Sequence, residues 1–167
     1  RSSDLRFDPP VGGHDLAQRQ RLDLILPDGD SKGLVVFVHG GYWMRFDKSS
    51  WTDLAEGARS HGWTVALPSY TLAPAARISD ITAEIAGAIA SAAAQVSGPI
   101  RLVGHSAGGH LVTRMLCDDS RLEPEVYDRI VATLSISGLH DLRPLLKTAM
   151  NGTLRMNMGE AALESAE

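Results

Sequence analysis

The sequence predicts an α/β domain with a mostly parallel central sheet and helices on both of its faces. Short apolar runs alternate with longer amphipathic or alanine-rich segments along most of the chain, and Gly and Pro turn signals stand between them. Several runs are continuously apolar, as expected of strands that are buried on both faces. Because strand–helix–strand connections form right-handed crossovers, this alternation builds a mostly parallel sheet.

Three strands and one helix are predicted before residue 70. Residues 21–26 alternate between polar and apolar side chains and stop at a Pro-Asp-Gly turn signal. Residues 34–38 are continuously apolar and are predicted to form a strand buried on both faces. Residues 49–61 begin at a Ser-Ser cap and end before a glycine, which predicts a helix. Residues 63–67 give a second buried strand, which is closed by a proline.

The alternation continues in the second half of the chain. Residues 79–96 place Ile, Ala and Val at helical spacing, and a Ser-Gly-Pro sequence ends this predicted helix. Residues 100–103 form a short predicted strand, and residues 107–117 can form a helix with an apolar inner face. Residues 129–137 give a further strand that ends at a glycine. Beyond Asp141 the pattern is loosely helical.

The composition excludes several classes of protein. The 167 residues include 16 Lys and Arg against 20 Asp and Glu, a net charge of −4, which argues against a nucleic-acid-binding surface. The single cysteine, Cys117, rules out a disulfide framework and a cysteine-based zinc cluster. No metal-ligand spacing and no glycine-rich nucleotide motif is found. No apolar run reaches the roughly 18 residues of a membrane span. We therefore expect a cytoplasmic protein without a metal or other cofactor.

A nucleophile elbow is predicted where one strand meets the next helix. The sequence Gly-His-Ser-Ala-Gly at 104–108 follows a predicted strand and opens a predicted helix, and it matches the G-x-S-x-G pattern. Such a turn holds its serine in a strained backbone conformation at the edge of the sheet. Gly104 and Gly108 let the strand and the helix approach closely, and His105 is the variable position. Ser106 is therefore the predicted nucleophile.

A glycine-rich loop is the second segment that carries chemistry. It directly follows a predicted buried strand, and ligands of parallel sheets bind beyond the carboxyl ends of the strands. The backbone N–H groups of Gly40 and Gly41, together with that of Ala107, are predicted to form an oxyanion hole. Tyr42 and Trp43 are candidates for the lining of an acyl or aromatic pocket. The alternative is a plain glycine-rich turn in which the aromatic residues belong to the core.

Four separated motifs together resemble the α/β-hydrolase superfamily, and in particular its hormone-sensitive-lipase-like esterases and the related kynurenine formamidases (arylformamidases). These motifs occupy residues 39–43, 69–74, 104–109 and 137–142, in family order. The Gly-Gly-Tyr-Trp form of the loop and the sequence at 139–145 favour the formamidase-like branch. The resemblance implies the α/β-hydrolase fold and a catalytic triad whose order along the chain is Ser, then Asp or Glu, then His.

The resemblance also implies that the acid and the histidine of the triad lie beyond residue 167. In the family they follow the seventh and eighth strands, whereas the strand at 129–137 is the sixth. His110 is expected to be a structural histidine, and His140 a pocket or surface residue. Asp141 is the best acid within the chain, with a helix N-cap as its alternative role. We therefore expect residues 1–167 to be one α/β-hydrolase domain truncated after the sixth strand, the N-terminal two-thirds of the whole.

These residues predict a serine hydrolase that needs no cofactor. Ser106 would attack the carbonyl group of a small carboxylic ester or an arylformamide and form an acyl-enzyme, which water then hydrolyses. The partner is therefore a small-molecule substrate, and the oligomeric state is left open. Two alternatives remain. One is a lipase, thioesterase or peptidase-like acyl hydrolase, and the other is a catalytically inactive binding protein with the same fold.

Overall fold

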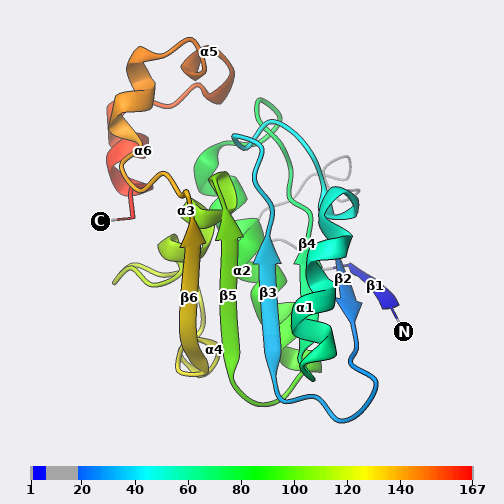
Figure 1. Cartoon of the computed structure of the whole chain (residues 1–167). Coiled ribbons are helices and arrows are strands. Elements are labelled where there is room, and N and C mark those ends of the chain that lie inside the picture. Colours follow the sequence, from blue (N-terminus) through cyan, green and yellow to red (C-terminus); the bar gives the residue numbers. More distant parts are fainter. Residues whose placement is uncertain (1, 7–18, 167) are drawn as a thin grey trace.

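The structure is a computed structural model of this chain, and it describes residues 2–6 and 19–166 (Figure 1). Within these residues, one sheet has the strand order β1-β2-β4-β3-β5-β6. Its strands are β1 Ser2–Arg6, β2 Arg21–Ile25, β3 Leu34–Val38, β4 Thr64–Pro68, β5 Ile100–His105 and β6 Ile130–Ile136.

The prediction of a mostly parallel sheet is confirmed. Strands β4, β3, β5 and β6 run parallel to one another, while β2 pairs antiparallel with β4 and β1 antiparallel with β2. The parallel strands place their carboxyl ends at one edge, where the loops after β3, β4 and β5 begin. Strand β1 was not predicted, because its five residues contain a single apolar side chain, Leu5.

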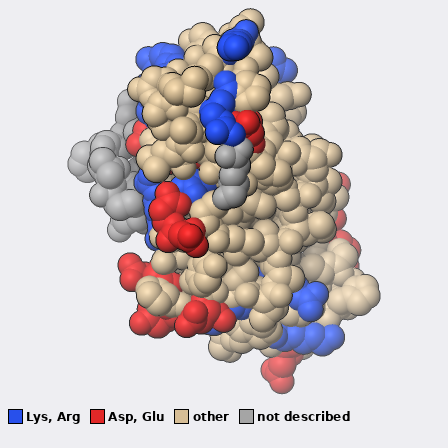
Figure 2. Space-filling model, turned by 90° about the vertical axis from the view of Figure 1, so that its left-hand side faces the viewer, with Lys and Arg blue, Asp and Glu red and all other residues tan. Residues whose placement is uncertain are grey.

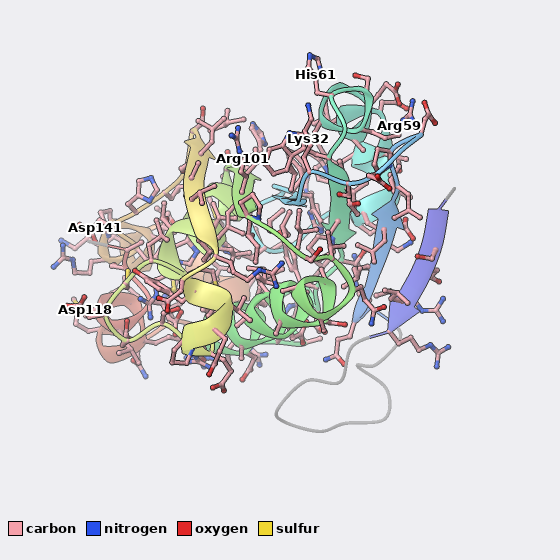
Figure 3. All side chains as sticks on the ribbon, turned by 90° about the horizontal axis from the view of Figure 1, so that it is seen from below. Lys32, Arg59, His61, Arg101, Asp118 and Asp141 are labelled. Atoms are coloured by element: carbon pink, nitrogen blue, oxygen red, sulfur yellow. The ribbon has the colours of Figure 1, made fainter. Side chains whose placement is uncertain are left out.

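Helices cover both faces of the sheet, as predicted. The described chain contains η2 Lys48–Leu54, α1 Ala55–Ser60, α2 Ile78–Gln95, α3 Ala107–Arg114, α4 Pro124–Tyr127, η3 Arg143–Lys147, α5 Asn151–Leu154 and α6 Met158–Leu163. Helix α1 lies on one face, and α2 lies on the opposite face (Figures 1 and 3). The helix predicted at 49–61 is 3-10 in its first part, because Ser, Thr, Asp and Trp are weak helix formers there.

Two apolar clusters form the core, one on each side of the sheet. The larger cluster joins the sheet to α2 and α3, and the smaller one joins β3 and β4 to α1. Helix α2 contributes Ile78, Ile81, Ile85 and Ile89, all with 0% exposure, at the spacing of one helical face. Alanines between them allow close packing against the sheet. None of the described helices is both long and apolar enough to cross a membrane.

Strand β6 forms an uncovered edge of the described sheet. It pairs with β5 on one side, and it has no partner strand among the described residues on the other. Its side chains Val131, Leu134 and Ile136 are 59%, 56% and 41% exposed. The side of the molecule that carries β6 shows a broad surface without charged residues (Figure 2). Apolar strand edges of this kind are usually covered in folded proteins.

Candidate active site

Ser106 occupies a strained turn between β5 and α3. Its backbone has φ 54° and ψ −115°, a conformation that non-glycine residues adopt only when the surrounding structure enforces it. Two hydrogen bonds do so: Ser106 N donates to Ile136 O over 2.8 Å, and Ser106 O accepts from His110 N over 3.2 Å. The side chain is only partly buried. The hydroxyl-bearing residue therefore stands at the carboxyl edge of the sheet.

Glycines permit the backbone contacts around this turn. A Cβ atom on Gly104 would lie 2.1 Å from Gly108 O, and one on Gly108 would lie 2.0 Å from Val38 O. No real Cβ atom tolerates such distances, so any side chain at either position would push β5, α3 and β3 apart. Both positions of the motif therefore require glycine for a steric reason.

The glycine-rich loop after β3 lies directly against the serine. A Cβ atom on Gly40 would be 2.8 Å from His105 O and 3.1 Å from Ser106 Cβ, so the two backbones touch. The loop then turns through Gly41, with φ 116°, and its carbonyl accepts from the N–H groups of Met44 and Arg45 over 3.0 Å each. The two segments singled out in the sequence are therefore brought together in space.

Buried aromatic and imidazole rings fix the start of this loop against the core. His39 stacks on Tyr70 with ring centroids 4.3 Å apart, and the Tyr70 hydroxyl donates to His39 O over 3.1 Å. Burial lowers the pKa of His39 to about 4. Its Nδ1 lies 2.8 Å from Gly40 O, and because a carbonyl only accepts, Nδ1 carries the proton. Burial also raises the pKa of Tyr70, which keeps its hydroxyl protonated.

The aromatic residues of the loop have different surroundings. Trp43 is fully buried in the larger core cluster, and its carbonyl accepts from Ala73 N over 2.8 Å. Tyr42 is 48% exposed, and Phe46, farther along the same loop, is 52% exposed. Tyr42 is therefore an exposed aromatic residue of this loop, whereas Trp43 belongs to the core and does not line an open pocket.

The remaining predicted residues have partners of their own. His140 places Nδ1 3.1 Å from Thr113 Oγ1 and Nε2 3.3 Å from Ser135 Oγ. Asp141 lies at the periphery of the molecule (Figure 3). Its Oδ1 accepts from the backbone N–H of Arg143 over 3.0 Å and from Arg143 Nε over 2.7 Å. Hydrogen bonds from Arg143 lower the pKa of the Asp141 carboxyl group.

Sequence reasoning missed one buried carboxylate that supports the site. Glu84 lies on α2 and is 4% exposed. It accepts from Thr71 N over 2.7 Å and from Gln20 Nε2 over 3.1 Å, so it fixes the segment after β4 on which Tyr70 stands. The available signal was a carboxylate among the apolar positions of an otherwise buried helix. No group of three or more potential metal ligands occurs in the described ranges.

Residues 35–164 match the family described as the Alpha/beta hydrolase family. The kynurenine formamidase of Danio rerio is 32% identical over 164 residues, which is 96% of this chain and 54% of that protein. The kynurenine formamidase of Salmo salar is 30% identical over 151 residues, 88% of this chain and 51% of that protein. The chain thus spans about half the length of the curated relatives it matches.

Solved structures agree with the fold. The crystal structure of a putative thioesterase from Silicibacter sp. TM1040 has a TM-score of 0.89 and 51% identity, and it covers 98% of this chain and 60% of that one. A bacterial heroin esterase has a TM-score of 0.65 and 21% identity over 100% of this chain and 54% of its own. The second likeness shows the shared fold alone.

Replacing Gly108 by alanine should disrupt the turn. The added methyl group would meet Val38 O, so we expect Gly108→Ala to lower the free energy of unfolding by about 3 kcal/mol. Urea unfolding of the full-length protein measures this. Gly57→Ala in α1 is the matched control, because nothing lies within 4 Å of its Cβ position. This variant should raise the free energy of unfolding by about 0.5–1 kcal/mol. Equal stability of the two variants would contradict the steric argument.

Acidification should destabilise the protein through two buried histidines. Burial lowers the pKa values of His39 and His110 from 6.5 to about 4. Between pH 6.5 and pH 4 these histidines are protonated in the unfolded chain but remain neutral in the folded chain. The free energy of unfolding therefore falls as the pH decreases from about 6.5 to about 4. Each histidine contributes at most about 1.4 kcal/mol per pH unit.

Urea unfolding at pH 7, 6 and 5 measures this slope. His110→Gln removes one of the two titrating groups, so its stability should depend less steeply on pH than that of the wild type. The same slope in both proteins would show that His110 does not contribute to the effect.

Proposed function

Because the chain belongs to the Alpha/beta hydrolase family, we propose that it carries the nucleophile and oxyanion hole of a cytoplasmic serine hydrolase that cleaves small carboxylic esters or arylformamides. One observation carries the proposal. Ser106 sits in a strained turn with φ 54°, and the backbone of Gly40 packs against its Cβ. Nucleophile and main-chain donors must meet in this way for acyl transfer. The similarity to kynurenine formamidases supports the arylformamide, and the single cysteine fits the cytoplasm.

The proposed reaction has two halves. Ser106 Oγ attacks the substrate carbonyl carbon while a histidine takes the hydroxyl proton, and the N–H groups of Gly40, Gly41 and Ala107 stabilise the oxyanion. The intermediate collapses to an acyl-enzyme and releases the alcohol or amine, which receives that proton. Water then attacks the acyl-enzyme with help from the same histidine, and the carboxylic acid leaves with Ser106 restored.

We place that histidine and its acid partner beyond residue 167. The ring nitrogens His39 Nδ1 and His110 Nε2 are committed to backbone carbonyls, and both rings are buried. The free edge of β6 and its exposed apolar side chains support a domain that continues, since a further strand could pair there. The greater length of the curated relatives, of which this chain spans about half, supports the proposal of further residues.

A thioesterase is the second candidate function. The putative thioesterase from Silicibacter sp. TM1040 is 51% identical to this chain, whereas the kynurenine formamidase of Danio rerio is 32% identical. A thioester would be attacked through the same intermediate, with a thiol as the leaving group. The two candidates therefore differ in the pocket around the leaving group, while the role of Ser106 is shared.

A fluorophosphonate probe tests the nucleophile. In the full-length protein we expect one covalent label on Ser106, because the probe phosphonylates an activated serine hydroxyl. The label, located by peptide mass spectrometry, should vanish in Ser106→Ala and persist in Ser97→Ala, which changes an exposed loop serine. A folded wild type that takes no label would contradict the enzyme and favour an inactive binding protein.

Turnover assays distinguish the substrate classes. We expect the full-length protein to hydrolyse N-formylkynurenine with a higher kcat/KM than p-nitrophenyl acetate or acetyl-CoA. The reason is the exposed aromatic ring of Tyr42, two residues after the Gly40 that contacts Ser106, onto which we propose that an aryl group stacks. Tyr42→Ala should raise KM for the arylformamide more than for the acetate ester. A clear preference for the thioester would replace the arylformamide by the second candidate.

A further inference from the structure

The loop that carries the oxyanion donors does not hold its shape by local preference. Tyr42, Trp43 and Phe46 all have positive φ values, of 54°, 59° and 73°. For non-glycine residues this left-handed conformation is unfavourable and persists only when tertiary contacts impose it. Within the loop, Met44 N and Arg45 N donate to Gly41 O, and the His39 ring donates to Gly40 O. Contacts from outside the loop must therefore fix the position of its donors.

The side chain of Trp43 joins the loop to the core. It is fully buried, and it is among the largest side chains that are. Its ring meets the ring of His110 in a T-shaped arrangement, with centroids 5.4 Å apart and an interplanar angle of 79°. Because the backbone of Trp43 is part of the strained turn, a shift of its ring would move the turn as well.

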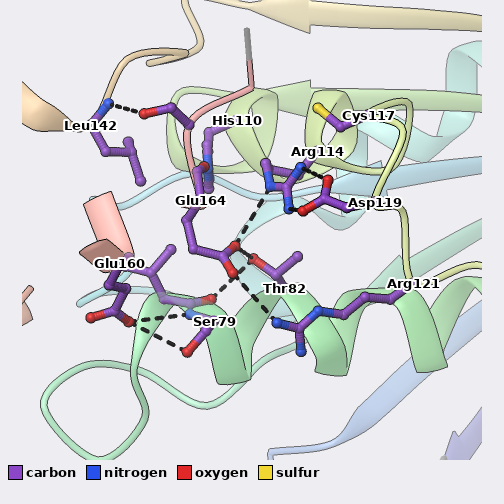
Figure 4. Close-up of polar contacts among 12 residues, drawn as sticks. Ser79, Thr82, His110, Arg114, Cys117, Asp119, Arg121, Leu142, Glu160 and Glu164 are labelled. Carbon is purple, nitrogen blue, oxygen red and sulfur yellow. Dashed lines mark hydrogen bonds and ion pairs between the residues drawn. The ribbon is translucent and has the colours of Figure 1, made fainter. Parts of the chain in front are cut away.

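His110 is itself fixed from its other side. It lies on α3, four residues after Ser106, and is completely buried. Its Nε2 donates to the backbone carbonyl of Glu164 over 2.6 Å, just after α6 (Figure 4). A carbonyl only accepts, so the ring carries its proton on Nε2 and its orientation is defined.

A buried polar network keeps Glu164 in place. Its carboxylate has no exposed surface and accepts from Thr82 Oγ1 over 2.7 Å. Arg121 Nη2 and Arg114 Nε lie 3.4 Å and 3.7 Å from its oxygens (Figure 4). Helices α2, α3 and α6 are joined at this one side chain. The support of the His110 ring therefore extends across the larger core cluster.

We propose that His110 is a positioning residue for the oxyanion hole. Its ring, oriented by the Glu164 carbonyl, holds Trp43 and through it the turn that presents the N–H groups of Gly40 and Gly41. The inference rests on the proposed function, but it concerns a residue that takes no part in the proton transfers. Its place one helical turn after Ser106 links the position of the donors to that of the nucleophile.

Two substitutions separate the ring contact from the hydrogen bond. His110→Gln keeps a side-chain N–H donor but loses the aromatic contact with Trp43. We expect it to lower kcat about tenfold or more while KM changes less than about threefold, since oxyanion donors act mainly in the transition state. His110→Phe keeps a ring against Trp43 and should recover kcat to within about threefold of the wild type, even though it loses stability.

Coupling to Trp43 provides the second readout. Trp43→Leu should lower kcat by a similar factor, and the double variant with His110→Gln should lose little more than either single one, because both interrupt the same contact. Thr64→Val is the matched control. It removes the hydrogen bond from Thr64 Oγ1 to Ser31 Oγ at the amino end of β4, outside the network of Glu164, His110 and Trp43, so it should reduce thermal stability and leave kcat unchanged.

The outcomes distinguish this inference from the proposed function. A wild type without turnover or labelling at Ser106 overturns both. An active wild type whose His110→Gln variant keeps kcat within twofold, or a double variant whose loss equals the product of the two single losses, overturns the positioning role alone. If His110→Gln does not fold, Trp43→Phe decides, since it shortens the ring that reaches His110. A fall in its kcat of about fivefold with KM retained supports the role, and an unchanged kcat refutes it.

Discussion

The contact between three backbones, those of β3, β5 and α3, is the constraint on which the site depends. Gly108 packs so closely on Val38 O that a Cβ atom would come within 2.0 Å of it. This contact places the first turn of α3 beside the end of β3, and the serine before α3 consequently faces the loop after β3. Two motifs that lie more than 60 residues apart in the sequence thereby meet at one edge of the sheet.

Strain in the site is balanced by the order of the core around it. Ser106, Tyr42 and Trp43 all have left-handed backbones, and each such residue costs about 1 kcal/mol or more. Their conformations persist because hydrogen bonds and buried rings enforce them. Ser106 N donates to Ile136 O, and Ala73 N donates to Trp43 O. The ring of Tyr70 stacks on that of His39. Preorganised donors of this kind need no rearrangement when charge develops on a substrate.

Local patterns explain which parts were predictable. Strand β3 was predicted from its continuous apolar run and helix α2 from its apolar periodicity. Ser106 and Gly40 were singled out because their motifs encode a required backbone geometry. Strand β1 has too little apolar character to be recognised. The roles of Tyr70, Glu84 and Glu164 depend on contacts between residues far apart in the sequence, and no local spacing reveals such contacts. Their burial is a property of the assembled core.

The chemistry of the histidines follows from where the fold places them. A general base works best when its pKa lies near the operating pH and when it reaches the hydroxyl it deprotonates. His39 and His110, with pKa values lowered to about 4, are weak bases at neutral pH, and each uses one ring nitrogen to hold a carbonyl. Burial fixes the orientation of these imidazole rings, but it also lowers their pKa and so makes them poor proton acceptors. A base for Ser106 has to be more accessible to solvent than either, so orientation and proton transfer fall to different histidines.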